Sequence, residues 1–293
     1  MKSSIAIKLI FISSLIIPFK NFGQYTEFGF GGGLSTYWGD LNSPSFSSNY
    51  SKNSGLALQL NIRKIFKNNI GVRASFVYGN VKGDDANSSL DWQKLRNLSF
   101  KSSISEFAIM GEYYLFGFDT EPGSTVFAPY VTAGISGFRF DPKTLYRGTE
   151  VRLQPLGTEG QSMIGFEKKY NLFSGGLCFG GGAKFIISET VNIGVEVVMR
   201  RTFTDYLDDV SKAYVNYDDL SDGNGTLAAS LGNRMNEYLG QSEPVLLATG
   251  TQRGGFKVRD YFIVSMITVN MLIDDGKGKR KFGRGNKVVC PKF

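Results

Sequence analysis

The sequence contains no histidine in 293 residues and only two cysteines, Cys178 and Cys290. Histidine is the usual general base and the commonest metal ligand, so its absence excludes hydrolases built on a Ser-His or Asp-His pair. Two cysteines cannot form a disulfide framework, so stability must come from backbone pairing and packing. We therefore expect no enzyme, and no metal ion or other cofactor.

Long apolar runs are also scarce, with a mean hydropathy of -0.12 although 42% of the residues are hydrophobic. Near the N-terminus, Lys2 precedes an apolar stretch whose uninterrupted part runs from Leu9 to Phe19. That part is shorter than the roughly 20 residues a membrane-spanning helix needs. The pattern favours a secretory signal peptide over a membrane anchor, and it predicts cleavage near Gly23 or Gln24. Residues 1–24 are assigned to this segment.

Positive charge is concentrated at the two ends of the chain, although the formal total is +7. Three lysines lie in residues 1–24, and residues 274–293 hold seven bases and two acids, so residues 25–273 carry about -1. A basic pI is therefore no argument for nucleic-acid binding. The tail, residues 274–293, is predicted to be flexible. It is either a solvated extension or a docking peptide for an acidic partner, with Lys277, Lys279, Arg280, Lys281, Arg284, Lys287, Cys290 and Phe293 as candidate contacts.

Alternation with a period of two recurs along the body of the chain. It is clearest where Leu56, Leu58 and Leu60 interleave with smaller or polar residues. Such alternation predicts strands with one apolar and one polar face. Eight segments qualify, and an even number suits a closed bacterial barrel. They are residues 25–34, 55–63, 70–76, 106–116, 127–140, 172–186, 191–197 and 260–273.

The connections between these segments alternate in length. Tight turns occur near Lys67 and Glu189, whereas the links 35–54, 82–105, 141–171 and 203–259 are long. Outer-membrane barrels have short periplasmic turns and long external loops. We therefore predict an all-β fold: an eight-stranded antiparallel transmembrane β-barrel over residues 25–273, in the outer membrane of a Gram-negative bacterium. Both termini would be periplasmic, so Lys67 and Glu189 are further candidate contacts for a periplasmic partner.

Aromatic residues gather near the ends of the predicted strands. Examples are Tyr78, Tyr113, Phe116, Tyr130 and Phe138. Aromatic girdles at both membrane interfaces are typical of transmembrane barrels. We interpret these residues as such girdles, and aromatic packing in the core of a soluble barrel is the alternative.

Charged residues at inward positions of the predicted strands have two interpretations. An eight-stranded barrel leaves an interior that side chains can fill, and charges kept there must pair. A structural ion network in a lumen that does not conduct is therefore favoured over a catalytic pair of carboxylates. Its candidate members are Arg63, Arg73, Glu106, Glu112, Lys184 and Glu196.

Several stretches of the body resemble the PorG-like family of outer-membrane proteins of Bacteroidetes. The resemblance covers nearly the whole chain after the signal peptide. It departs at the final strand, which ends Met271, Leu272, Ile273 without the terminal aromatic residue of an assembly signal. The stretches that carry it are residues 27–33, 37–41, 96–100, 129–142 and, most specifically, 153–161 and 201–211.

This resemblance implies a non-enzymatic scaffold of the type IX secretion system, which transports proteins and supports gliding motility. The barrel would tether a periplasmic ring, formed by a lipoprotein and its soluble partner, to the outer membrane. Expected partners are outer-membrane lipid and these ring proteins, with no nucleic acid and no small-molecule substrate. The alternative is a general outer-membrane barrel with adhesive or ligand-binding external loops. An enzyme embedded in the membrane is the least favoured reading.

Overall fold

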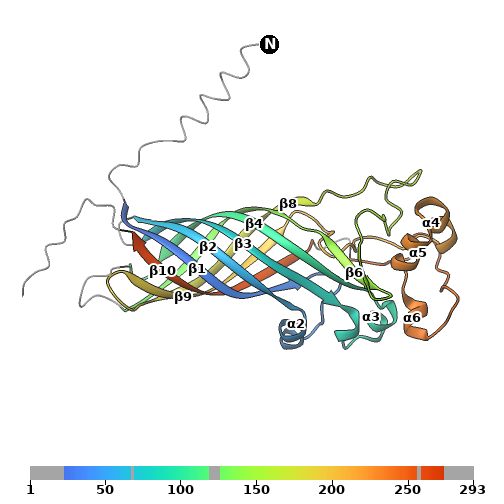
Figure 1. Cartoon of the computed structure of the whole chain (residues 1–293), viewed down its shortest axis with the longest axis horizontal. Helices are drawn as coiled ribbons and strands as arrows, with labels where there is room; N and C mark the ends of the chain where they lie inside the picture. Colours follow the sequence, from blue (N-terminus) through green and yellow to red (C-terminus); the bar gives the residue numbers. More distant parts are fainter. Residues whose placement is uncertain (1–22, 67–68, 119–125, 256–258, 274–293) are drawn as a thin grey trace, which may run out of the picture.

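The computed structural model describes residues 23–66, 69–118, 126–255 and 259–273 (Figure 1). The predicted signal peptide up to residue 22, the basic tail and Lys67 lie outside the described residues. Among the helices within those ranges, none combines the length and apolar character needed to cross a membrane.

Eight long strands form a closed antiparallel barrel. Its order is β3-β2-β1-β10-β9-β8-β5-β4, and pairing of β3 with β4 closes the sheet. The predicted eight-stranded antiparallel barrel is therefore confirmed. Closure leaves no strand edge in this wall, as a barrel in lipid requires. The strands are β1 (Gly23–Trp38), β2 (Ser54–Phe66), β3 (Ile70–Asp84), β4 (Ser99–Tyr114), β5 (Phe127–Arg139), β8 (Phe173–Ile186), β9 (Val191–Thr202) and β10 (Tyr261–Ile273).

The outer face of the barrel is apolar and the inner face is largely polar. On β2, Leu58 is 53% exposed and Ile62 is 51% exposed, whereas Gln59 and Arg63 between and beside them are buried. The other long strands continue this band of exposed apolar side chains. Exposure of so large an apolar surface to water is unfavourable, and in outer-membrane barrels lipid covers this surface. The chain is thus a membrane-spanning barrel of the outer-membrane type.

Several strands, among them β1, β3 and β4, run further than the sequence pattern predicts. β1 continues to Trp38, β3 continues to Asp84 and β4 begins at Ser99. The predicted links 35–54 and 82–105 are correspondingly too long. The alternation is inverted here, because the outward positions, such as Asn80 and Ser103, are polar and inward positions such as Val81 and Ile104 are apolar. The strands rise beyond the apolar band while they remain paired.

The long links carry further elements, which gather at the end of the barrel opposite the start of β1 and the end of β10 (Figure 1). We call this end the loop end and the opposite one the turn end. A hairpin of β6 (Pro142–Tyr146) and β7 (Thr149–Arg152) extends the sheet by pairing with β4. The helical elements are α2 (Phe46–Lys52), η1 (Asp85–Asn87), α3 (Asp91–Arg96), α4 (Tyr217–Asn224), α5 (Thr226–Gly232) and α6 (Met235–Leu239).

Glycine allows β1 and β10 to approach closely on the inner side of the wall. A Cβ atom at Gly33 would lie 1.9 Å from the carbonyl oxygen of Ser265, and at Gly29 it would lie 2.1 Å from Asn270 Oδ1. No side chain fits in that space. Glycine at such positions lets a small barrel close around a filled interior.

The predicted aromatic girdles are correct only in part. Tyr78, Tyr113 and Phe116 are exposed on the outer face. Tyr130 and Phe138, however, are buried inside the barrel. Both occupy inward positions of β5, where they pack with other aromatic rings near the two ends of the lumen. Position near a strand end does not decide which face a ring occupies.

Candidate functional site

The middle of the lumen holds a chain of charged side chains with alternating sign. Arg63 on β2 binds Glu27 on β1 at 2.9 Å and Glu112 on β4 at 2.7 Å. Arg73 on β3 binds Glu112 at 3.2 Å and also pairs with Glu196 on β9. Lys184 on β8 pairs with Glu27 at the other end of the chain. These contacts connect six of the eight barrel strands across the interior.

Uncharged side chains add hydrogen bonds to the three carboxylates of this network. Glu196 accepts hydrogen bonds from Gln59 Nε2 at 3.0 Å and from the Tyr130 hydroxyl at 2.8 Å. The Tyr114 hydroxyl donates to Glu112 at 2.8 Å, and Asn192 donates to Glu27 at 2.8 Å. Charges buried in a low dielectric are tolerated when they are paired and hydrogen-bonded in this way.

A second ion pair lies nearer the loop end. Arg200 Nε on β9 lies 3.1 Å from Glu106 Oε2 on β4. The layer of Ala108, Met110, Cys178 and Val198 packs at the intervening positions of these strands. Of the six predicted members of the lumen network, five belong to the alternating chain, and Glu106 belongs to this separate pair.

Sequence reasoning missed two charged residues of the lumen, Glu27 and Arg200. Phe28 and Phe30 are exposed on the outer face, so the alternate residues Glu27 and Gly29 point inward. Arg200 was missed because the predicted strand stopped at Val197, whereas β9 runs to Thr202. With these two, the named lumen groups comprise four carboxylates and four cations. All are at most 4% exposed, so they fill the interior and balance one another.

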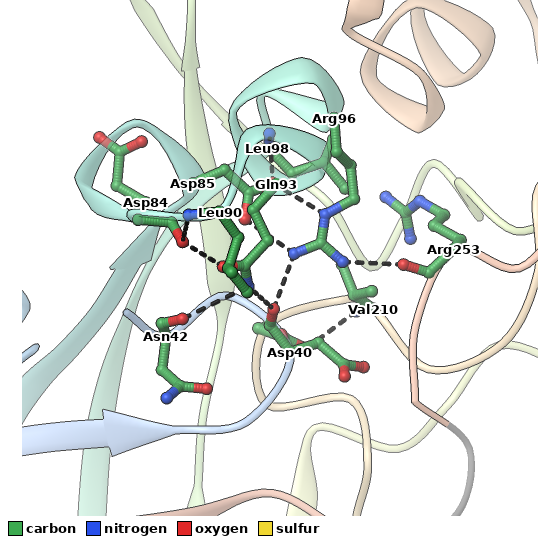
Figure 2. Close-up of polar contacts among 12 residues, drawn as sticks. Asp40, Asn42, Asp84, Asp85, Leu90, Gln93, Arg96, Leu98, Val210 and Arg253 are labelled. Atoms are coloured by element: carbon green, nitrogen blue, oxygen red, sulfur yellow. Dashed lines mark hydrogen bonds and ion pairs between the residues drawn. The ribbon is translucent and has the colours of Figure 1, made fainter. Parts of the chain in front are cut away.

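At the loop end, Arg96 joins three of the long links (Figure 2). Its guanidinium binds both carboxylate oxygens of Asp85, at 2.8 and 2.7 Å. The same group donates to the carbonyl oxygens of Asp40 at 2.7 Å and Arg253 at 2.8 Å. Loop backbone lacks the regular partners of a sheet, so buried carbonyls there need other donors. Arg96 supplies them at the centre of a folded loop-end cap, formed by the described residues of the four long links.

Arg253 has the same role between the two longest links. It donates to the carbonyl oxygens of Asp209 at 2.8 Å and Gly232 at 3.1 Å, and it forms an ion pair with Glu159 at 3.0 Å. Glu159 also accepts from the backbone N–H of Ser211 at 3.0 Å. The link after β5 is therefore bound to the link after β9.

Two buried carboxyl groups in the cap share one tyrosine. The Tyr37 hydroxyl lies 2.5 Å from Asp208 Oδ2 and 2.9 Å from Asp260 Oδ1. The Tyr37 hydroxyl has one proton, so it can donate to only one of the two carboxyl groups. If the other carboxyl is protonated, it can donate to the hydroxyl oxygen, and both contacts are then hydrogen bonds. Burial, followed by the charge of Asp260, raises the pKa of Asp208 well above its usual range. Burial also raises the pKa of Asp260 well above its usual range.

Asp209 lies beside this group and is also fully buried. It accepts hydrogen bonds from Thr158 at 2.5 Å and from Tyr170 at 2.6 Å. Burial raises the pKa of Asp209 to about 6, although Arg253 opposes the shift. The cap therefore holds carboxyl groups that titrate above the usual range of aspartate.

A family model matches residues 6–228, which is more than half of the chain. The chain belongs to the DUF6089 family, described as a domain of unknown function. The match covers nine of the ten strands, β1 to β9, and ends within α5, before β10. No curated protein sequence matches the chain.

Solved barrels resemble this DUF6089 chain at low sequence identity. Neisserial surface protein A is 9% identical, with a TM-score of 0.40, over 84% of this chain and 96% of the other. OprG of Pseudomonas aeruginosa is 16% identical, with a TM-score of 0.42, over 86% and 97%. Outer membrane protein W of E. coli is 13% identical, with a TM-score of 0.35, over 85% and 98%.

The stretches that carry the resemblance to the PorG-like family meet in the cap. Residues 153–161 contain Thr158 and Glu159, which bind Asp209 and Ser211 of residues 201–211. Of the predicted partner-binding residues, Glu189 is exposed in the turn between β8 and β9. Lys67 and the eight tail residues lie outside the described residues.

Proposed function

We propose that this DUF6089 barrel is a non-enzymatic scaffold that tethers the periplasmic ring of the type IX secretion system to the outer membrane. The observation that supports the proposal best is the filled lumen, in which each of the eight named charges is paired with an opposite charge. Carboxylates held by arginine and lysine are poorly placed for acid-base chemistry, and a filled interior offers no pathway for a solute. Such a barrel is suited to anchor in the membrane the turns and links that it carries at its two ends.

The turn end is the side that would face the periplasm. Short turns are periplasmic in outer-membrane barrels, and β1 begins and β10 ends at this side of the barrel (Figure 1). The basic tail follows directly from β10, and Glu189 lies in one of the turns. We infer that the tail and these turns contact the ring, with the tail bases meeting acidic groups of the partner.

The folded cap favours a second candidate function, contact with an external ligand or surface. A pocket of about 460 Å³ lies between the β6–β7 hairpin and the helices α4 to α6. Tyr146, Tyr217 and Glu237 are among its lining residues. Polar and aromatic side chains in a concave surface are typical of ligand contacts.

Crosslinking in intact cells tests the first function. A photoreactive amino acid at Glu189 should capture the ring lipoprotein or its soluble partner, while the same group at Tyr238 in α6 should not. A chain truncated after Ile273 should keep the compact gel mobility of a folded barrel but lose co-purification of the ring. Unchanged co-purification, or ring crosslinks from Tyr238 instead of Glu189, would contradict the proposal.

A further inference from the structure

A row of four basic residues crosses the sheet at the loop end. Lys82 on β3 is directly opposite Lys101 on β4, Lys101 is opposite Lys143 on β6, and Lys143 is opposite Arg152 on β7. Residues directly opposite one another in antiparallel strands point to the same face. The cations therefore stand side by side on the outer face, and we call them the basic row.

The half of the basic row on β3 and β4 lacks compensating charge. Arg152 binds Asp141 at 2.9 Å, and Lys143 lies 3.8 Å from Glu150. Within the described part of the chain, neither Lys82 nor Lys101 makes an ion pair, and both are exposed. Like charges placed directly opposite one another destabilise a sheet. The adjacent pair of Lys82 and Lys101 is therefore suited to bind an anion from outside the chain.

The basic row lies directly beyond the lipid-facing surface. Along β3 the outward positions are Phe76 and Tyr78, 46% and 50% exposed, followed by Asn80 and then Lys82. Lys82 lies four positions after Tyr78, which is about 13 Å along the strand. Tyrosine typically occupies the level of the membrane interface. Lys82 therefore stands beyond the hydrocarbon, where lipid head groups lie.

A shallow pocket of about 280 Å³ completes the surface. Lys52, at the end of α2, adds a fourth lysine to Lys82, Lys101 and Lys143 around this pocket. Two acids, Asp84 and Glu150, also line it, so the lining keeps an excess of two positive charges. The other polar side chains of the lining bind within the protein, as Asn87 donates to Asn53 at 2.9 Å and the hydroxyls of Ser99 and Thr144 lie 3.2 Å apart. The four lysines are therefore the groups that would bind an oxyanion.

We infer that the basic row binds the phosphate groups of an anionic lipid in the leaflet at the loop end. The ammonium groups of Lys82 and Lys101 would bind the phosphate, while the acyl chains of the lipid lie on the apolar wall below. Continuity between the cations and the lipid-facing surface favours a lipid over a soluble phosphate. The inference depends on the barrel being in a membrane and is independent of the tethering function.

Binding of a purified phosphorylated glycolipid of the lipid A type to the full chain in neutral detergent tests this inference. Lys82→Gln combined with Lys101→Gln should weaken the affinity on the order of thirtyfold, because each basic residue near an anionic membrane surface contributes appreciably to binding. Lys168→Gln combined with Lys212→Gln, an equal charge change at the loop end but off the row, should leave the affinity within about twofold. Compact gel mobility shows that each variant is folded.

Two further arms distinguish the source of the phosphate. The same glycolipid without its phosphates should bind the unaltered chain as weakly as the double variant binds the phosphorylated form. Inorganic phosphate at millimolar concentration should not displace the phosphorylated lipid. Equal affinity for the double variant and the unaltered chain would overturn the inference, as would full displacement by inorganic phosphate.

Discussion

The lumen and the loop-end cap both bury charge, but they stabilise it differently. In the lumen, carboxylates bind cations from neighbouring or facing strands, as where Glu112 bridges Arg63 and Arg73. In the cap, Arg96 and Arg253 bind one carboxylate each and donate their other N–H groups to backbone carbonyls of the links. Asp208 and Asp260 meet at a tyrosine instead of a cation.

This difference follows from the backbone. Strand residues in the lumen have their N–H and C=O groups paired in the sheet, so side-chain charges are free to pair with one another. Link residues in the cap leave carbonyls without sheet partners, so the arginines satisfy these carbonyls and some acids remain without a cation. The comparison teaches that the lumen depends on charge balance, whereas the cap depends on hydrogen bonds and on protonation.

Removal of one lumen charge should have the largest effect. Glu112→Gln leaves Arg63 and Arg73 buried with less compensating charge, and breaking a buried network of this kind costs about 3–5 kcal/mol of unfolding free energy. Urea unfolding followed by loss of the compact gel mobility measures this. Glu150→Gln, in an exposed pair with Lys143, is the control and should change the free energy by less than about 0.5 kcal/mol. A similarly small loss for both variants would remove the distinction between lumen and surface.

A change of pH should affect the cap and leave the barrel wall intact. The pKa of Asp209 is raised to about 6 in the folded cap, so its contribution to stability is present at low pH and is lost as the pH rises through 6. We expect the cap to lose about 2 kcal/mol of stability between pH 4 and pH 7. The two tryptophans, Trp38 and Trp92, lie at the loop end, so their fluorescence during urea unfolding reports on the cap.

A variant of Asp209 tests whether this one carboxyl group causes the pH dependence of the cap. Asp209→Asn removes the titrating carboxyl while it retains an acceptor for Thr158 or Tyr170, so the pH dependence should become smaller. Asp222→Asn, on the exposed face of α4, should leave the pH dependence unchanged. Equal pH dependence for the unaltered chain and Asp209→Asn would show that other groups control the cap.

The barrel could be predicted from the sequence because its signal is local. The alternation at Leu56, Leu58 and Leu60 indicates which face of the strand contacts lipid. The alternation of short and long links indicates which end of the barrel each connection lies at. The inward positions of Arg63, Arg73 and Glu112 follow from the same period. Beyond the lipid-facing band the pattern is inverted, with apolar Val81 and Ile104 inward and polar residues outward, which is why β3 and β4 were predicted too short.

The cap could not be predicted in the same way. Its contacts join residues far apart in the chain, such as Tyr37 with Asp208 and Arg96 with Arg253, and no periodic pattern connects them. The stretches that resemble the PorG-like family include several of these residues, but resemblance does not indicate which of them touch. The pairing of Lys101 with Lys143 likewise depends on a hairpin inside a link that carries no long alternation.

Electrical recording from the purified barrel in a planar lipid bilayer tests the filled lumen most directly. With the lumen occupied by paired charges and by apolar layers at both ends, insertion should give no stable open level above the bare bilayer. Large, stable conductance steps that scale with the amount of inserted protein would contradict the filled lumen and, with it, the scaffold function.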